Sequence, residues 1–241
     1  MARAAISFII TLCSIVSIAV AQDPRPRVPP GLDPGGVAIA LLSTGIDYTL
    51  PVLATRLARD GEGELISWDF ESNDNRPFDR SAGQTPAEWG GDGTALATAL
   101  VSSPGVRLVA VRIVPEEPQS LARAAAFLSQ TPTRVAIMAM RSPHPQDWQP
   151  FALAAARFKD ILFIVPAGSM EPRPAALENV VAVGASTAGM NSVGFGGATK
   201  VLAPSDAALV AAARLAANAL TRNPKTSLPE LKRLIGESSG R

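Results

Sequence analysis

Short apolar runs alternate with helical patterns along most of the 241-residue chain, and this order constrains the fold more than any other feature. Several of the runs are continuous stretches of Val, Ile, Ala and Leu, which is typical of strands that are buried on both faces of a parallel sheet. Strands that alternate with helices form such a sheet through crossover connections. We therefore predict an α/β fold of three layers, with a mostly parallel central sheet and helices on both of its faces.

The periodicity places each element approximately. The predicted strands are Val37–Leu42, Leu65–Asp69, Arg107–Ile113, Arg134–Met140, Ile161–Val165, Val180–Gly184 and Lys200–Ala203. The predicted helices are Pro51–Arg59, Gly93–Val101, Pro118–Gln130, Trp148–Phe158 and Asp206–Arg222. One more helix is predicted after Ser227, because Ser227-Leu-Pro-Glu230 has the spacing of a capping box with proline in the first turn.

The N-terminus is typical of an exported protein. Residues 1–21 have a positive charge at Arg3, an apolar run and an Ala19-Val20-Ala21 cleavage site, so they are predicted to be a signal peptide. The alternative is an uncleaved N-terminal anchor. Residues 22–36 are rich in proline and predict an extended linker, and residues 37–241 are then one domain.

Charge and cysteine content exclude several functions. Arg3 is the one charged residue of the signal segment, so the exported chain has 21 basic and 21 acidic residues. Without a basic block, nucleic acids and anionic membranes are poor candidate partners. The single cysteine, Cys13, lies in the signal segment, so the exported chain has no disulfide and no thiol chemistry. No cofactor motif is present, and we predict none.

Two blocks carry a resemblance to a known family. The strand at residues 37–42 runs into Ser43-Thr-Gly-Ile-Asp47, and a second block reads Gly91-Asp-Gly-Thr-Ala-Leu-Ala97. These are similar to the Asp and His motifs of subtilisin-like serine peptidases. Further blocks resemble the same family in the same order, namely Trp68–Pro77, Arg107–Ile113, Val135–Met140, Ile164–Ser169, Asn179–Ala185 and Val201–Pro204. The resemblance implies a subtilisin-like fold for residues 37–241.

The chain departs from the family where the chemistry would be. Ser43 stands at the position of the catalytic Asp, and Asp92 stands at that of the catalytic His. The segment before the nucleophile is missing, which leaves Ser205 as the nearby hydroxyl. Ser169 stands at the oxyanion position, and Arg141 replaces a permissive glycine of the substrate-binding stretch. A serine nucleophile needs a base that titrates near neutral pH, and Asp, with an ordinary pKa of about 3.9, is a weak one. We therefore predict a degenerate triad.

Other polar residues allow more than one interpretation. Asp92 is predicted to cap the helix that follows it, and the alternative is a Ser43–Asp92 hydrogen bond. Asp69, Asp74 and Asp79, with the neighbouring Asn73 and Asn75, are weak calcium candidates, because Asp and Asn clusters are also ordinary turn formers. His144 is the only histidine and is predicted to be exposed in a loop.

Three functional hypotheses follow from the resemblance. The first is a periplasmic or secreted, catalytically inactive pseudopeptidase that binds a peptide or a protein partner. The second is a serine endopeptidase with a rearranged site that uses Ser205 or Ser169. The third is a companion subunit of an active protease or a membrane complex.

Overall fold

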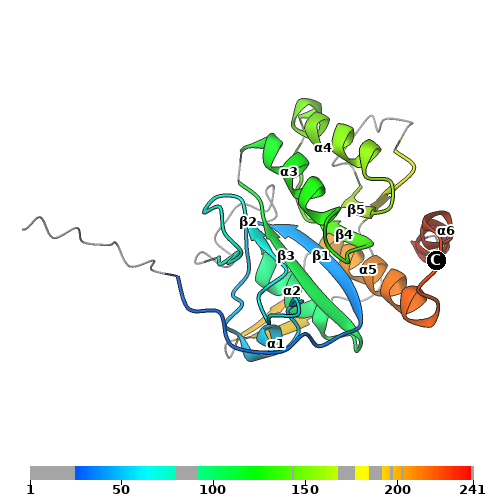
Figure 1. Cartoon of the computed structure of the whole chain (residues 1–241). Coiled ribbons are helices and arrows are strands. Elements are labelled where there is room, and N and C mark those ends of the chain that lie inside the picture. Colours follow the sequence, from blue (N-terminus) through cyan, green and yellow to red (C-terminus); the bar gives the residue numbers. More distant parts are fainter. Residues whose placement is uncertain are drawn as a thin grey trace, which may run out of the picture.

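Six parallel strands form the central sheet, in the order β2-β3-β1-β4-β5-β6 (Figure 1). The computed structural model of the chain describes residues 25–79, 92–114, 116–142, 144–167, 177–184, 192–195, 198–201 and 204–239. The strands of the sheet are β1 (Val37–Ser43), β2 (Trp68–Asp69), β3 (Val106–Arg112), β4 (Val135–Met138), β5 (Leu162–Pro166) and β6 (Val180–Val183). The predicted signal peptide lies outside the described residues.

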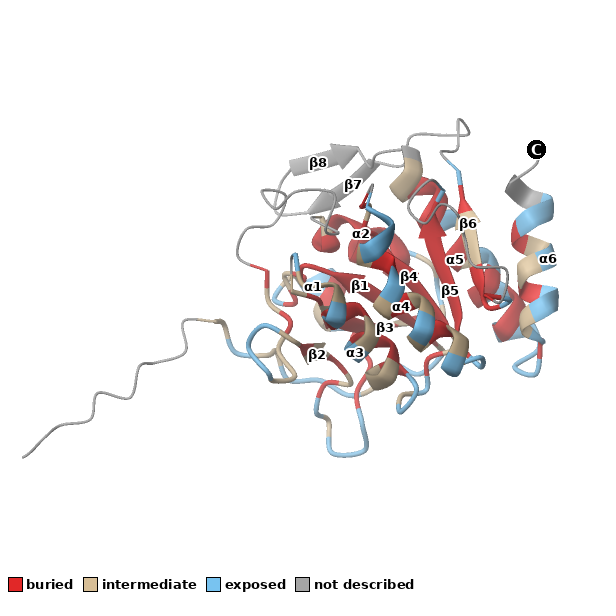
Figure 2. Ribbon diagram, turned by 90° about the horizontal axis from the view of Figure 1, so that it is seen from above, coloured by how far each residue is buried: buried red, intermediate tan, exposed pale blue. Residues whose placement is uncertain are grey.

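Helices cover both faces of the sheet, as predicted. They are α1 (Pro51–Ala54), α2 (Gly93–Val101), α3 (Pro118–Leu128), α4 (Pro145–Arg157), α5 (Pro204–Arg222) and α6 (Leu228–Ser239). In β1, Ile39 and Leu41 point to the cluster that contains α2 and α5, whereas Ala40 and Leu42 point to the cluster of α3 and α4. All four side chains are fully buried, and Figure 2 shows how the burial concentrates in the sheet and the inner sides of the helices. Burial of each large aliphatic side chain contributes about 1.5–3 kcal/mol.

Two predicted elements differ from those observed near the edge strand β2. The helix predicted over Pro51–Arg59 ends at Ala54, because the chain then turns extended and pairs with β3 through the Leu57–Leu108 bridge. Leu57 is buried there, so tertiary pairing outweighs local helix propensity. The strand predicted over Leu65–Asp69 is reduced to Trp68–Asp69.

The strand predicted over Lys200–Ala203 does not join the main sheet. Instead β7 (Ser192–Phe195) and β8 (Ala198–Val201) form a separate antiparallel pair. The sequence carries a hairpin signal that the analysis missed, since two glycines, Gly196 and Gly197, separate the two strands. By contrast, the predicted last helix is confirmed, and its Glu230 N–H donates to the Ser227 hydroxyl at 3.4 Å.

Residues 25–36, which we call the N-terminal strap, have no helix or strand but are bonded to the domain. The Tyr48 hydroxyl donates to Pro26 O at 2.8 Å, and the Arg59 guanidinium donates to Pro29 O at 2.6 Å. Near the end of the strap, Asp33 accepts from the Arg59 N–H at 2.8 Å and pairs with Arg107 at 2.6 Å. No helix within the described residues is long and apolar enough to cross a membrane.

Asp33 gives the first testable prediction. Burial of the carboxyl group raises its pKa, but hydrogen bonds from the Arg59 and Gly35 N–H groups and from Arg107 outweigh this, and the net pKa is lowered. A lowered pKa stabilises the fold above the unfolded value of about 3.9, and that contribution is lost as the pH falls through the folded pKa. We expect Asp33→Asn to reduce the free energy of unfolding at neutral pH by about 1–2 kcal/mol. The variant will also lose less stability on acidification than wild type.

Urea unfolding at a series of pH values measures both effects. Asp160→Asn is the matched control, because Asp160 is exposed in the turn before β5. The same pH dependence in the Asp33 variant as in wild type would contradict the assignment.

Candidate functional site

The carboxyl ends of the parallel strands meet at one edge of the sheet, where the residues predicted from the sequence gather. Ser43 is the last residue of β1 and is only 1% exposed. Its hydroxyl donates to Gly45 O and accepts from the Gly45 N–H, both at 3.3 Å. Its backbone oxygen accepts from the Ile113 N–H at 2.8 Å. The hydroxyl therefore stabilises the turn that leaves β1.

Asp92 caps helix α2, as predicted. Its Oδ1 accepts from the Ala95 N–H at 3.0 Å. The next residue, Gly93, lies directly against β1, because a Cβ added to it would be 2.4 Å from Ser43 Oγ and 2.1 Å from Gly45 O. Ser43 therefore lies next to the start of this helix. The hydrogen bonds of Ser43 go to Gly45, whereas the sequence analysis allowed a bond to Asp92.

The close approach of Gly93 to β1 predicts a large effect of a single methyl group. Gly93→Ala must push the start of α2 away from Gly45 O, which is backbone and cannot rotate away. We expect the variant to lose about 2 kcal/mol or more of unfolding free energy in a denaturant titration. Gly61→Ala is the control, because no atom lies within 4 Å of its added Cβ, and its change should stay within about 0.5 kcal/mol. Equal effects of the two substitutions would contradict this packing.

Ser205, the candidate nucleophile, is held by an arginine. Ser205 and Asp206 lie in the first turn of α5, and Arg141 follows β4. The guanidinium of Arg141 donates to Ser205 Oγ at 2.8 Å and forms an ion pair with Asp206. The Asp206 side chain is 14% exposed and that of Arg141 is 28% exposed, so water screens this ion pair only in part. Arg141 was expected from the sequence only as the replacement of a glycine, and its two partners were not predicted.

The hydrogen-bond partner of the Ser205 hydroxyl is a donor, Arg141, whereas catalysis by a serine requires an acceptor for the hydroxyl proton. A nucleophilic hydroxyl must lose its proton to a nearby base. A guanidinium group has five N–H donors and no acceptor, and it stays protonated in proteins. Arg141 therefore orients the Ser205 hydroxyl and cannot accept its proton. His144, the only histidine, is exposed at the N-cap of α4, and Asp92 is bonded to its own helix.

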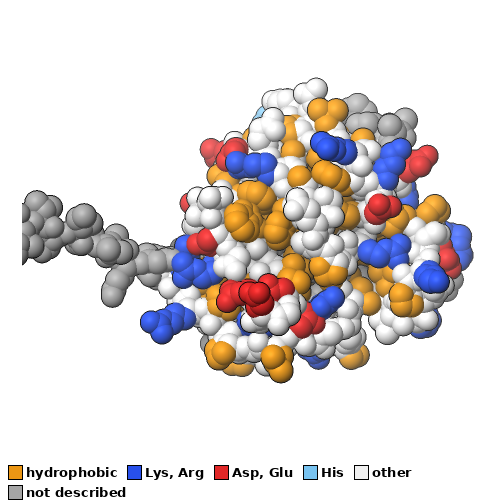
Figure 3. All heavy atoms as spheres, viewed as in Figure 1, with side chains coloured by type: hydrophobic (Ala, Val, Ile, Leu, Met, Phe, Trp, Pro, Cys, Tyr) orange, Lys and Arg blue, Asp and Glu red, His pale blue; other side chains and the backbone are white. Residues whose placement is uncertain are grey.

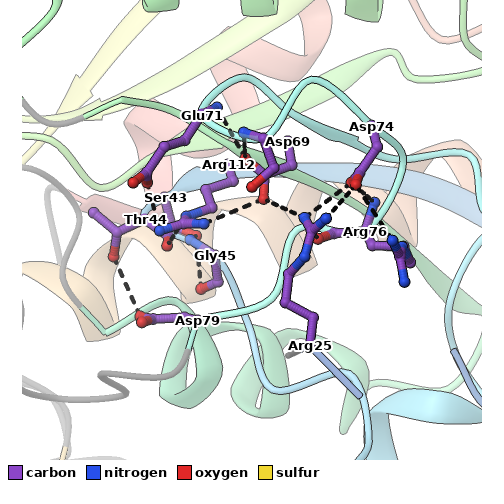
Figure 4. A network of polar contacts seen from close by, with 11 residues as sticks. Arg25, Ser43, Thr44, Gly45, Asp69, Glu71, Asp74, Arg76, Asp79 and Arg112 are labelled. Atoms are coloured by element: carbon purple, nitrogen blue, oxygen red, sulfur yellow. Dashed lines mark hydrogen bonds and ion pairs between the residues drawn. The ribbon is translucent and has the colours of Figure 1, made fainter. Parts of the chain in front are cut away.

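Arginines also surround the predicted calcium candidates, which lie in residues 69–79, here called the acidic loop (Figure 4). The Asp69 side chain is fully buried, and its Oδ2 pairs with Arg112 at 3.2 Å and with Arg25 at 3.3 Å. Its Oδ1 accepts from the N–H groups of Glu71 and Ser72, both at 2.9 Å. Both oxygens of this carboxylate are thus occupied by protein donors.

The other two candidates have protein partners as well. Asp74 binds Arg25 through both oxygens, at 3.1 Å and 2.5 Å, and lies 3.7 Å from Arg76. Asp79 accepts from the Thr44 hydroxyl at 3.4 Å. Among the residues that the structure describes, no group of three or more His, Cys, Asp or Glu side chains is placed to hold a metal ion. Asp69 and Asp74 of the acidic loop therefore belong to an ion-pair network with Arg25, Arg76 and Arg112.

This network predicts that calcium has little effect. Calcium at about 1 mM, enough for a typical extracellular site, should leave the Tm unchanged relative to sodium chloride of the same ionic strength. Chelation with EDTA should also leave it unchanged. Differential scanning calorimetry measures both. A calcium-specific rise in Tm that is lost in Asp74→Asn would show that a metal displaces the arginines.

The structure describes some of the other polar and aromatic residues of the chain but not all of them. Trp148 is buried in the α4 layer and donates to Ser142 O at 3.1 Å, so it is a core residue. Ser169, the residue at the oxyanion position, lies outside the described residues. A cavity of about 730 Å³ lies at the opposite edge of the sheet, between the loops that enter β4, β5 and β6, and is therefore separate from the carboxyl-end residues.

Comparison with solved structures assigns the fold. A cold-adapted subtilisin-like serine proteinase matches with a TM-score of 0.53 and 15% identity, over 85% of this chain and 82% of the other. Sphericase matches with a TM-score of 0.58 and 18% identity, over 85% and 83%. The PatG macrocyclase in complex with peptide matches with a TM-score of 0.52 and 13% identity, over 80% and 79%. No family model and no curated protein sequence matches the chain.

The protein therefore has the subtilisin-like fold, and the fold predicted from the sequence is confirmed. At these identities the likeness establishes the fold alone. What the chain does must be argued from its own residues.

Proposed function

We propose that the protein is an exported, catalytically inactive subtilisin-like protein that binds a peptide or a protein partner at the carboxyl edge of its sheet. The observation that carries the proposal is the hydrogen bond from Arg141 to Ser205, together with the Arg141–Asp206 ion pair. A serine nucleophile needs a base that accepts its proton, and Arg141, the partner of the Ser205 hydroxyl, can only donate. The second hypothesis, a serine endopeptidase, requires such a base at Ser205 or at Ser169.

A binding role is supported by the place of the site in the fold. In open α/β sheets, ligands bind at the carboxyl ends of the strands, where Ser43 and Arg141 lie. One similar structure is of a macrocyclase that holds a peptide, which makes a peptide the first class of ligand to test. Acidic and basic side chains are interspersed on the face drawn in Figure 3, and the net charge of the whole chain is +1, so a polyanion is a poor candidate.

Export is supported by the sequence of residues 1–21, with its apolar run and its small-residue cleavage site. We propose a periplasmic or secreted location. The companion-subunit hypothesis differs only in the partner, which would be a protein of the same compartment. Affinity capture of the exported protein tests it, and it fails if no protein co-purifies.

If a peptide binds at the carboxyl edge of the sheet, substitutions at that edge should change its Kd and substitutions at the opposite edge should not. Arg141→Ala removes the side chain that spans β4 and α5, so it should change the Kd of a bound peptide by about fivefold or more. Arg157→Ala, at the cavity on the opposite edge, should leave the Kd unchanged and serves as the control. Fluorescence anisotropy with an unbiased library of labelled extended peptides supplies the measurement. The proposal fails if no peptide binds or if both variants bind like wild type.

A further inference from the structure

Arg25, a partly buried residue at the start of the N-terminal strap, binds the acidic loop of the domain. Arg25 donates to Asp69 Oδ2 at 3.3 Å, to Asp74 Oδ1 at 3.1 Å and to Arg76 O at 3.3 Å. Its side chain is only 13% exposed, and it contacts Asp69, whose side chain is 0% exposed. A buried carboxylate that loses a counter-charge is left imperfectly compensated, so Arg25 matters more than an exposed ion pair would.

We propose that the strap is a releasable clamp on the carboxyl end of β1, and that its release loosens the residues that border the candidate site. The clasp of this clamp is the set of contacts that Arg25 makes with Asp69 and Asp74. The inference deepens the proposed function, since it names a control on the same edge of the sheet, and its regulatory meaning rests on that function.

A short chain of contacts connects the clasp to β1 (Figure 4). Asp69 Oδ2 is shared between Arg25 and Arg112, and Arg112 Nε donates to Thr44 O at 3.0 Å. Thr44 directly follows Ser43. The acidic loop is also bonded to Ile46, which donates to Pro77 O at 2.9 Å and accepts from the Asp79 N–H at 3.1 Å. Loss of the clasp therefore acts on residues 43–46 through both Arg112 and the loop.

The composition of the strap makes it easy to release. Its prolines have no N–H to donate, and two of their carbonyls serve as acceptors for side chains of the domain. The strap has no sheet pairing, and Leu32 is 87% exposed. Val28 contributes a partly buried apolar contact, and Asp33 anchors the end near β1. A segment held by so few groups opens at a lower free energy than the core does.

Hydrogen–deuterium exchange of the full exported chain tests the clamp, with Arg25→Gln compared with Arg27→Gln. Arg27 is the matched control, because it is an exposed residue of the same type two positions along the strap. In the Arg25 variant we expect residues 43–46 and the acidic loop to exchange about tenfold faster than in wild type, while β4 and β5 are unchanged. The Arg27 variant should match wild type throughout.

Two results would overturn the inference. One is unchanged exchange at residues 43–46 in Arg25→Gln, and the other is an equal acceleration in β4 and β5, which would mean global destabilisation. Asp33→Asn separates the two ends of the strap, since it should accelerate exchange near Arg59 but not at residues 43–46. Hydrogen–deuterium exchange is measured without a binding partner. The absence of peptide binding would therefore contradict the proposed function, whereas the exchange rates of residues 43–46 alone decide the clamp.

Discussion

The carboxyl edge of the buried parallel sheet determines where Ser43, Arg112 and Arg141 lie. Because both faces of β1 are packed against helices, the polar residues that leave the strands can gather only at the strand ends. Ser43 ends β1, Arg112 ends β3 and Arg141 follows β4. Gly93 brings the start of α2 against the same edge, so closely that an added Cβ would lie 2.1 Å from Gly45 O. The site is therefore a consequence of sheet packing.

At this edge, arginine is the recurring partner of polar side chains. Arg112 and Arg25 neutralise Asp69, and Arg141 binds Ser205 and Asp206. Guanidinium groups donate and never accept, and they keep their charge at any physiological pH. They suit the fastening of loops and helix ends to the sheet. They do not suit the removal of a proton, which is the step that a serine peptidase requires of its site.

Sequence patterns predicted the local and the topological features well. The apolar runs predicted the six strands of the sheet, and the helix from Gly93 to Val101 has the predicted bounds. The predicted end of α1 at Arg59 was wrong, because Leu57 pairs with Leu108 of β3, and a contact so distant in sequence leaves no local pattern. Arg25 and Arg141 were also missed as anchors, because their partners are 44 or more residues away in the chain and nothing local indicates the pairing.

We propose that Arg141 orients the hydroxyl of Ser205 and that no base activates it. A fluorophosphonate probe, read by intact mass and peptide mapping, is the sharpest test, because the probe labels only an activated serine. We expect no labelling of the purified exported protein at neutral pH. Labelling that maps to Ser205, and that disappears in Ser205→Ala, would contradict it.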